Sequence, residues 1–205
     1  MSRLVTFGCS YTSGECLPDI YPTRFSTSSL AWPSVLGNLL SKEVINQGSP
    51  GAGNAEILHN ILNYNFKSDD LVIVLWTHFT RYEDLSFEGN YEKKRFFGTT
   101  KKYAKDLYFL ERNYYLDNAY KNYLAIQHCQ LYLNSKNLNS ISFLLRQSNS
   151  GPHNELHCPN FLEISNLHFL NVEDFIVDKA LDNQHFGVES HKKLAELIFE
   201  IINKQ

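Results

Sequence analysis

The chain has 205 residues, 43% of them hydrophobic and 20% charged, a composition typical of a globular protein with one sizeable core. A formal net charge of −3 without a basic stripe excludes the electrostatic pattern of a nucleic-acid-binding protein. No apolar run approaches the roughly 20 residues that span a bilayer, and the N-terminal segment lacks the features of a secretory signal. We therefore expect a cytoplasmic protein with no nucleic-acid or membrane partner.

Hydrophobic periodicity and turn residues predict alternating strands and helices along the chain. The first half contains a strand at 4–7, a helix at 29–40, a strand at 44–46, a helix at 54–64 and a strand at 70–76. The second half contains an aromatic and charged insertion or lid at 81–112, a helix at 113–135, strands at 140–145 and 168–170, and a helix at 187–203. This order predicts a single domain over residues 1–205: an α/β/α three-layer sandwich around a mostly parallel, flavodoxin-like sheet.

Individual residues agree with these elements. The strand predicted at Asp70–Trp76 has apolar side chains on both faces, as a central strand of a parallel sheet requires. Pro33 fits the first turn of its helix, where a missing N–H is tolerated, and Asn54 is a candidate cap of the next helix. Between Ser10 and Ser28 the chain is polar and is expected to form a loop, and His191 is expected on the surface of the last helix.

The cysteines do not indicate a metal site. The chain contains Cys9, Cys16, Cys129 and Cys158, with no C-x-x-C pairing. Reduced thiols are the simplest interpretation, and a Cys9–Cys16 bridge is the alternative. The segment His153-x-x-x-His157-Cys158, even with His168, lacks the second ligand pair of a structural zinc site. We therefore expect no metal.

Two separated motifs carry the chemistry. Ser10 follows the first strand directly after Gly8-Cys9, and Asp182-Asn183-Gln184-His185 precedes the last helix. A serine hydroxyl needs an adjacent imidazole to take its proton as it attacks, and the imidazole needs an acceptor that fixes its tautomer. Ser10, His185 and Asp182 therefore predict a nucleophile, its base and the residue that orients the base.

The loops that follow the first three strands should meet at one edge of the sheet, because parallel strands share their carboxyl ends there. The second of these loops, Gly48–Asn54, is rich in glycine, which permits a close approach to a substrate. An oxyanion that develops during acyl transfer needs preplaced donors. We expect the backbone N–H groups of Ser10 and Gly51 to be two of them.

These residues resemble the sequence blocks of the SGNH (GDSL-type) hydrolases. The first block, usually Gly-Asp-Ser, is similar to Gly8-Cys9-Ser10, the oxyanion block is similar to Asn46–Gly51, and the last block is similar to Asp182–His185. The resemblance extends from Val5 to about Ile202 and leaves about 81–110 outside. It implies the SGNH fold, with the nucleophile at Ser10, the oxyanion glycine at Gly51, the base at His185 and its orienter at Asp182.

The third block differs from the family pattern. A typical member has Gly-x-Asn-Asp after the third strand, and its Asn donates a side-chain N–H to the oxyanion, whereas this chain has Trp76-Thr77-His78-Phe79. Losing one such donor without replacement lowers the rate about a hundred- to a thousandfold. We expect Thr77 or His78 to supply a substitute donor, and Trp76 and Arg81 to contact the substrate. Further polar contacts to the substrate are hypothesised for Glu15 and Glu83.

The sequence therefore predicts a serine esterase or acyl hydrolase that works through a covalent acyl-enzyme and needs no cofactor. Its partner is expected to be a small-molecule or carbohydrate ester, and the resemblance suggests a short acyl group such as acetyl. Two alternatives stay open. The same three residues also suit an acyltransferase, and a non-catalytic binding module on the same scaffold is compatible with the altered third block.

Overall fold

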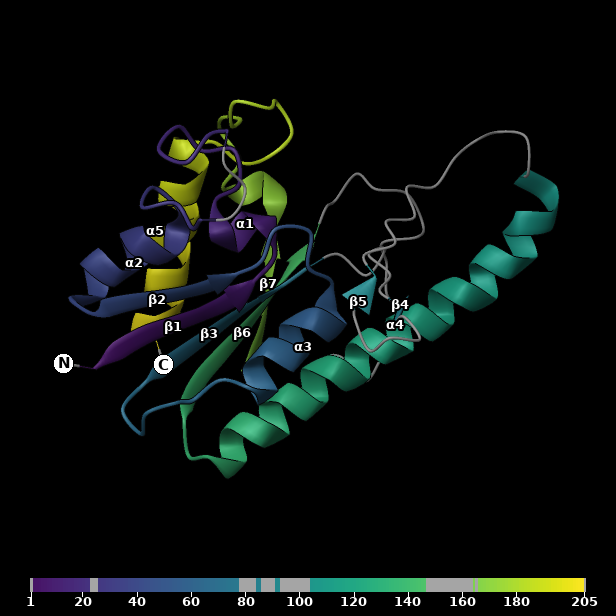
Figure 1. The fold of residues 1–205 in the computed structure, drawn as a ribbon, viewed down its shortest axis with the longest axis horizontal. Helices are drawn as coiled ribbons and strands as arrows, with labels where there is room; N and C mark the ends of the chain where they lie inside the picture. Colours follow the sequence, from purple (N-terminus) through teal and green to yellow (C-terminus); the bar gives the residue numbers. More distant parts are fainter. Residues whose placement is uncertain are drawn as a thin grey trace.

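The core of the computed structural model is a five-stranded sheet in which every strand pair is parallel. The structure describes residues 2–22, 26–77, 84–85, 91–92, 104–146, 164 and 166–204. The strands are β1 (Arg3–Gly8), β2 (Glu43–Gly48), β3 (Leu71–Trp76), β6 (Asn139–Arg146) and β7 (Leu167–Asn171). Their spatial order is β2-β1-β3-β6-β7, so the strand order reverses between β1 and β3 (Figure 1). A reversal of this kind opens a crevice at the carboxyl ends of the strands.

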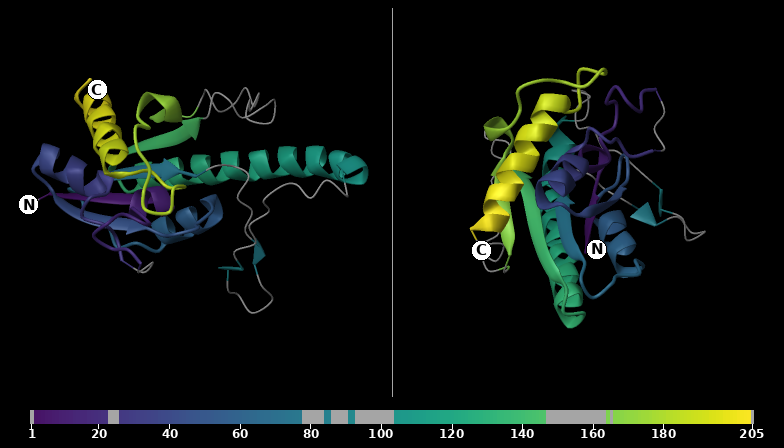
Figure 2. Two further views of the ribbon diagram at one scale, coloured as in Figure 1. Left: turned by 90° about the horizontal axis from the view of Figure 1, so that it is seen from above. Right: turned by 90° about the vertical axis from the view of Figure 1, so that its left-hand side faces the viewer.

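Helices cover both faces of the sheet, which confirms the predicted three-layer α/β architecture (Figure 2). On one face lie α2 (Trp32–Leu40) and α5 (Val188–Asn203), and on the other lie α3 (Asn54–Leu62) and the long α4 (Ala104–Ser135). The shorter elements are α1 (Ser10–Ser13), the 3₁₀ helix η3 (Val172–Asp174), and a small antiparallel pair, β4 (Asp84–Leu85) with β5 (Tyr91–Glu92). Within the residues described, no helix is both long and apolar enough to cross a membrane.

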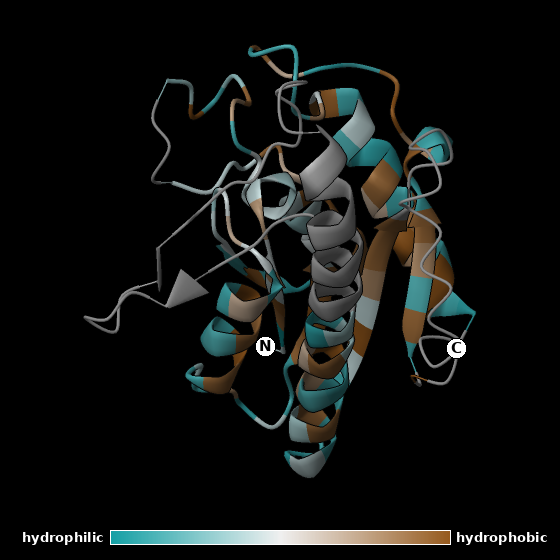
Figure 3. Cartoon of the chain, turned by 90° about the vertical axis from the view of Figure 1, so that its right-hand side faces the viewer, coloured by the Kyte–Doolittle hydropathy of each residue, from teal (hydrophilic) through white to brown (hydrophobic). Residues whose placement is uncertain are grey.

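The sequence of β3 explains how the two cores form. All six of its residues are buried, and alternate side chains point to opposite faces of the sheet. Leu71, Ile73 and Leu75 join the core under α2 and α5, and the other three residues of the strand join the core under α3 and α4. The visible strands in Figure 3 are accordingly mostly hydrophobic, whereas the helices alternate between hydrophobic and hydrophilic residues.

Two predicted boundaries were wrong. The stretch that begins at Ser10 was expected to be a loop, but Ser10–Ser13 forms the helix α1. The helix predicted from residue 113 begins at Ala104, so residues 104–112 of the predicted insertion belong to α4. The remainder of that insertion lies outside the described residues, apart from β4 and β5. Hydrophobic periodicity locates the ends of helices poorly, and a helix of four residues is too short to show a period.

His191 was predicted on the surface of α5, but it is 1% exposed. Its Nδ1 accepts a hydrogen bond of 3.1 Å from the backbone N–H of Trp32, the first residue of α2. The imidazole therefore satisfies one of the N–H groups that a helix leaves unpaired at its start. This bond links α5 to α2, and the burial lowers the pKa of His191 to about 4.

The helix α1 lies directly on the carboxyl end of β2 because Gly48 has no side chain. A Cβ at Gly48 would lie 2.3 Å from the backbone nitrogen of Ser13 and 2.7 Å from the carbonyl carbon of Thr12. Asn46 fixes the same contact, because its Nδ2 donates to the carbonyl of Thr12 at 2.8 Å and its Oδ1 accepts from the N–H of Gly48 at 2.9 Å. The end of β2 thus determines where α1 sits.

We predict that His191 makes the stability of the protein depend on pH between about 4 and 6.5. In this window the unfolded chain binds a proton that the folded imidazole excludes, because the folded pKa is about 4 and the ordinary value is 6.5. The free energy of unfolding should therefore fall as the pH is lowered, by about 2 kcal/mol between pH 7 and pH 5. Urea unfolding at the two pH values measures it.

The variant His191→Asn keeps an acceptor for Trp32 but does not titrate, so its free energy of unfolding should change much less over the same window. A small dependence remains, because burial also lowers the pKa of His168. The variant His59→Asn, at an exposed histidine, is the control, and its free energy of unfolding should depend on pH as that of wild type does. Equal pH dependence in wild type and His191→Asn would refute the assignment.

Gly48→Ala should destabilise the fold by about 1–3 kcal/mol, since the added methyl group overlaps backbone atoms of α1 that cannot rotate away. Urea or thermal unfolding measures the loss. The exposed neighbour Gln47 offers a matched control, and Gln47→Ala should stay within about 0.5 kcal/mol of wild type. If both variants unfold like wild type, the close approach of α1 to β2 is not required.

Candidate active site

Ser10 is the first residue of α1, immediately beyond β1 and its N-cap residue Cys9. The turn between strand and helix is tight: a Cβ at Gly8 would lie 2.0 Å from Oγ1 of Thr12 and 2.9 Å from the carbonyl oxygen of Leu75. Glycine before the serine is therefore a steric requirement. The Ser10 side chain is 2% exposed, and its Oγ has no hydrogen-bond partner among the described residues.

The Asp-x-x-His segment forms a compact turn between η3 and α5. Oδ1 of Asp182 accepts the backbone N–H groups of Gln184 and His185, both at 3.0 Å. Asn183 adopts φ +57°, which asparagine tolerates better than most residues. The turn is closed by an antiparallel bridge between Lys179 and Phe186. The three-residue spacing between Asp182 and His185 thus follows from a local turn, in which the aspartate side chain accepts hydrogen bonds from the backbone of the residues that follow it.

The same carboxylate orients the imidazole. Oδ2 of Asp182 lies 2.6 Å from Nδ1 of His185, a short charge-assisted hydrogen bond. Burial acts to raise the pKa of Asp182, but the two backbone N–H groups and the imidazole outweigh it and hold this pKa well below its usual range. Asp182 therefore remains a carboxylate, and it is hydrogen-bonded to the imidazole of His185.

Aromatic contacts bring this turn to α1. The rings of Tyr11 and Phe186 are stacked, with centroids 4.1 Å apart and planes 10° apart. Tyr11 also contacts the ring of His185 edge-on at 5.7 Å. The backbone N–H of Leu181 donates to the carbonyl of Cys16 at 3.2 Å. The residue after Ser10 and the residue after His185 are thus packed against one another.

The other ring nitrogen of His185 faces a residue whose contact with it was not predicted. Its Nε2 lies 3.6 Å from Oε2 of Glu15, and Glu15 is 5% exposed. Glu15 was expected to contact substrate, and no sequence pattern joins it to the distant histidine. The structure therefore pairs Nε2 with a carboxylate, and Oγ of Ser10 makes no hydrogen bond to it.

Gly51 and Thr77, two of the predicted oxyanion donors, lie at the carboxyl edge of the sheet. Gly51 is buried in the β2–α3 loop with φ +78°, a conformation that favours glycine. The N–H of Thr77 already donates to Oδ1 of Asn54 at 2.9 Å, so this N–H is not available. The Thr77 hydroxyl is buried and has no hydrogen-bond partner among the described residues. His78 lies outside the described residues.

Asn54 does not cap α3 as predicted, because the N-cap is Gly53 and no side chain caps that helix end. Its amide instead joins three elements: it pairs with the backbone of Thr77 in both directions and donates to Oδ1 of Asn122 on α4 at 2.6 Å. Asn54 is only 2% exposed, and its side-chain amide makes these long-range bonds in the interior. Asn54 therefore fixes the end of β3.

Of Trp76, Arg81 and Glu83, which were predicted to contact the substrate, the structure describes only Trp76. Trp76 has no exposed surface and belongs to the core under α3 and α4, so its indole cannot reach a substrate in this conformation. Arg81 and Glu83 lie outside the described residues.

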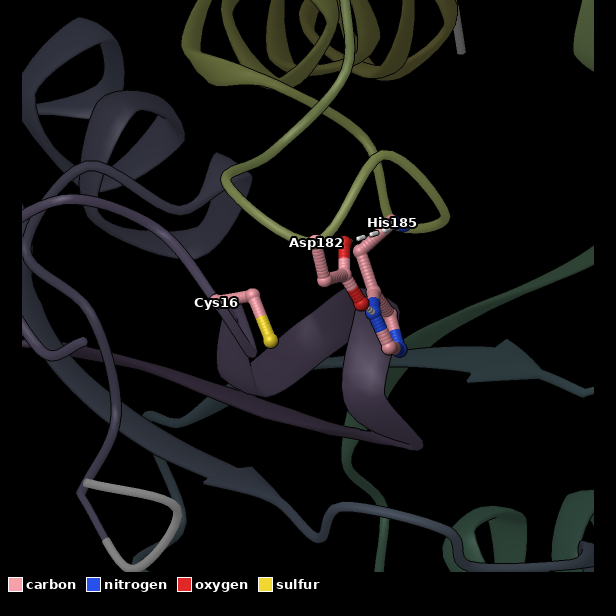
Figure 4. Close-up of side chains that lie close together, drawn as sticks. All are labelled: Cys16, Asp182 and His185. Atoms are coloured by element: carbon pink, nitrogen blue, oxygen red, sulfur yellow. Dashed lines mark hydrogen bonds and ion pairs between the residues drawn. The ribbon is translucent and has the colours of Figure 1, made fainter. Parts of the chain in front are cut away.

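Cys9 and Cys16 are not joined by a disulfide, so the alternative of a bridge between them was wrong. The thiol of Cys16 instead lies beside Asp182 and His185 (Figure 4). Of the zinc cluster rejected above, only His168 is described, on β7.

Solved structures with similar folds were found, although no family model and no curated protein matches the chain. The carbohydrate acetylesterase Est24 from Sinorhizobium meliloti has a TM-score of 0.58 at 15% identity, covering 100% of this chain and 99% of that one. A candidate lipolytic protein of the G-D-S-L family from Desulfitobacterium hafniense DCB-2 has a TM-score of 0.55 at 16% identity, covering 98% and 99%. The acetyl xylan esterase Est2A from Butyrivibrio proteoclasticus has a TM-score of 0.59 at 15% identity, covering 99% of this chain but 63% of that one.

These likenesses extend over nearly the whole chain and include esterases and a lipolytic protein. The chain therefore has the fold of the SGNH (GDSL-type) hydrolases, as its motifs predict.

Proposed function

We propose that the protein is a serine esterase that hydrolyses a short-chain ester through a covalent acyl-enzyme. The observation that carries this proposal is the 2.6 Å hydrogen bond between Asp182 and Nδ1 of His185, beside the helix that begins at Ser10. A carboxylate bound to Nδ1 leaves Nε2 as the nitrogen that exchanges a proton. This is the arrangement that activates a serine hydroxyl.

In the proposed reaction, Oγ of Ser10 attacks the ester carbonyl while Nε2 of His185 takes the hydroxyl proton. The tetrahedral intermediate collapses, the C–O bond to the leaving alcohol breaks, and the imidazolium returns its proton to that alcohol. Water, deprotonated by His185, then attacks the carbonyl carbon of the acyl-enzyme and forms a second tetrahedral intermediate. When this intermediate collapses, the bond from the carbonyl carbon to Oγ of Ser10 breaks, the imidazolium returns its proton to Oγ, and the acid leaves. Asp182 stabilises the imidazolium in both steps and holds the neutral imidazole in the tautomer that has its proton on Nδ1.

Developing charge on the carbonyl oxygen is proposed to meet the backbone N–H groups of Ser10 and Gly51. The Thr77 hydroxyl is the third donor, because it is buried and makes no other hydrogen bond among the residues described. It would replace the Asn that the third sequence block lacks. His78 remains an alternative donor by its position next to Thr77.

Catalysis requires the imidazole to leave Glu15. Nε2 lies 3.6 Å from the Glu15 carboxylate in this structure, and the buried Oγ of Ser10 has no hydrogen-bond partner in the described part of the chain. Catalytic hydrogen bonds are often long or absent before substrate binds. We propose that an entering ester displaces side chains over Ser10 and that Nε2 then turns to its hydroxyl.

The substrate class is proposed to be a small-molecule or carbohydrate ester with a short acyl group such as acetyl. The names of the similar structures Est24 and Est2A, a carbohydrate acetylesterase and an acetyl xylan esterase, support this choice. A non-catalytic binding module is the second candidate, and the absence of a Ser10–His185 hydrogen bond favours it. One similar structure is described as having divergent catalytic and non-catalytic binding functions.

Labelling by a fluorophosphonate separates the two candidates. The wild-type protein should gain one adduct, located on Ser10 by mass spectrometry, because only an activated hydroxyl attacks the phosphorus rapidly. Ser10→Ala should abolish labelling and lower kcat on nitrophenyl acetate by at least about 10³-fold. Ser13→Ala, on the same helix, is the control and should label. A folded wild-type protein that stays unlabelled at every pH would leave only the binding module.

Asp182→Asn should lower kcat by about 10³- to 10⁴-fold with a smaller change in KM. The amide cannot stabilise the imidazolium and favours the wrong tautomer, although it keeps an oxygen for the backbone N–H groups of the turn. Initial rates on nitrophenyl acetate measure the loss, with thermal unfolding as a check that the loop persists. A kcat within about threefold of wild type would remove Asp182 from the mechanism.

A further inference from the structure

A cysteine that the proposed reaction does not use lies against the two residues that orient and move its proton. One ligand atom each from Cys16, Asp182 and His185 lie within 4.8 Å of one another (Figure 4). In the part of the chain that the structure describes, this is the one group of three such side chains close enough to share a metal ion. The thiol comes from the segment after α1, and the other two come from the turn before α5.

The position of Cys16 is fixed by the fold. Its residue is 7% exposed and adopts φ +67°, and its carbonyl accepts the N–H of Leu181 from the opposite loop at 3.2 Å. The thiol forms no disulfide. Because the residue that directly precedes Asp182 is bound to Cys16, the two loops hold the sulfur and the carboxylate side by side. The proximity is therefore built into the backbone.

The three donors form a set that suits zinc. A thiolate, an imidazole and a carboxylate bind Zn²⁺ at about 2.0–2.3 Å, and sites with three protein ligands keep a fourth position for water. Ligand atoms around a tetrahedral zinc ion are roughly 3.3–3.6 Å apart by this geometry. Side-chain rotations that move each ligand atom by about 1 Å would therefore bring the three atoms to the distances that a bound zinc ion requires. Oxygen-seeking Mg²⁺ and Ca²⁺ do not favour a sulfur ligand.

The charge around the cluster also favours a cation. Asp182 remains a carboxylate, and the carboxylate of Glu15 lies 3.6 Å from Nε2 of His185. We propose that Cys16, Asp182 and His185 form a site for Zn²⁺ and that zinc bound there reversibly inhibits the esterase. The inhibitory part rests on the function proposed above, and the binding part does not.

Zinc would inhibit the proposed reaction whichever ring nitrogen of His185 it binds. Zinc on Nε2 would occupy the atom that must take the Ser10 proton. Zinc on Nδ1 would replace the proton now shared with Asp182, so the carboxylate would orient the metal and no longer the imidazole. In both cases binding releases protons from the thiol, and affinity should rise with pH.

The test starts from metal-free, reduced full-length protein. Zinc is titrated by calorimetry, and Co²⁺ is titrated in parallel because a thiolate bound to Co²⁺ gives an intense near-ultraviolet charge-transfer band. We expect one ion per chain, a thiolate band with Co²⁺, and at least a tenfold weaker zinc affinity in Cys16→Ala, since even an outer-shell partner is worth about 10- to 100-fold. Cys129→Ala, a buried free cysteine on α4, is the matched control and should bind zinc as wild type does.

Each result decides the proposal. Absence of zinc binding at millimolar concentration, a cobalt complex without the thiolate band, or an unchanged affinity in folded Cys16→Ala overturns the site. The wild-type cobalt spectrum decides the thiol's role even if Cys16→Ala fails to fold. Ser10→Ala should bind zinc like wild type, because the hydroxyl is not a ligand.

The activity arm separates the two proposals. If wild type hydrolyses nitrophenyl acetate, stoichiometric zinc should abolish at least nine-tenths of the rate, a chelator should restore it, and Cys16→Ala should keep its rate at that zinc concentration. Full activity of the zinc-loaded protein overturns the inhibition. If wild type has no esterase activity, the proposed function fails, and calorimetry still decides the zinc site.

Discussion

The stacking of Tyr11 on Phe186 joins the two ends of the sequence at one place. The rings lie 4.1 Å apart and nearly parallel, and each follows a site residue directly, Ser10 in one case and His185 in the other. Such a pair stabilises by only about 0.5–1.5 kcal/mol beyond the area it buries. Its importance is positional, because α1 is itself held against Gly48 and the turn of His185 is held by Asp182. Because each piece is locally fixed, this stack, the edge-on contact of Tyr11 with His185 and the hydrogen bond from Leu181 to Cys16 together place one relative to the other.

The parallel sheet supplies the frame for this contact. Since all five strands run the same way, the segments after β1, β2 and β3 leave the sheet at one edge. The strand order reverses between β1 and β3, so the chain departs to opposite faces there and leaves room above the sheet. Ser10 and Thr77 flank that point, and Gly51 approaches from β2. The order and direction of the strands thus determine where Ser10, Gly51 and Thr77 meet.

Features encoded by neighbours in sequence could be predicted, and features made by distant residues could not. The burial of β3 follows from its unbroken apolar run, and the Asp182–His185 bond follows from a three-residue spacing that forms its own turn. His191 looked like a surface residue because its partner is the N-terminus of a helix 159 positions away. Glu15 and Cys16 carry no signal for the same reason: only folding brings them to His185.

Two buried hydroxyl groups, on Ser10 after β1 and on Thr77 after β3, lie at the carboxyl edge of the sheet. Gly8 and Leu75 are paired in register, and Ser10 and Thr77 each follow two residues later. Both hydroxyl oxygens are buried without a hydrogen bond among the described residues, which costs about 1–3 kcal/mol for each group. The side-chain amide of Asn54 already bonds the N–H and the carbonyl of Thr77, so only the hydroxyl of Thr77 can donate a hydrogen bond to a ligand. Under the proposed mechanism, the substrate's carbonyl oxygen would accept the hydrogen bond that the Thr77 hydroxyl now lacks, and this bond would strengthen as negative charge develops on that oxygen, so it would stabilise the transition state more than the bound substrate.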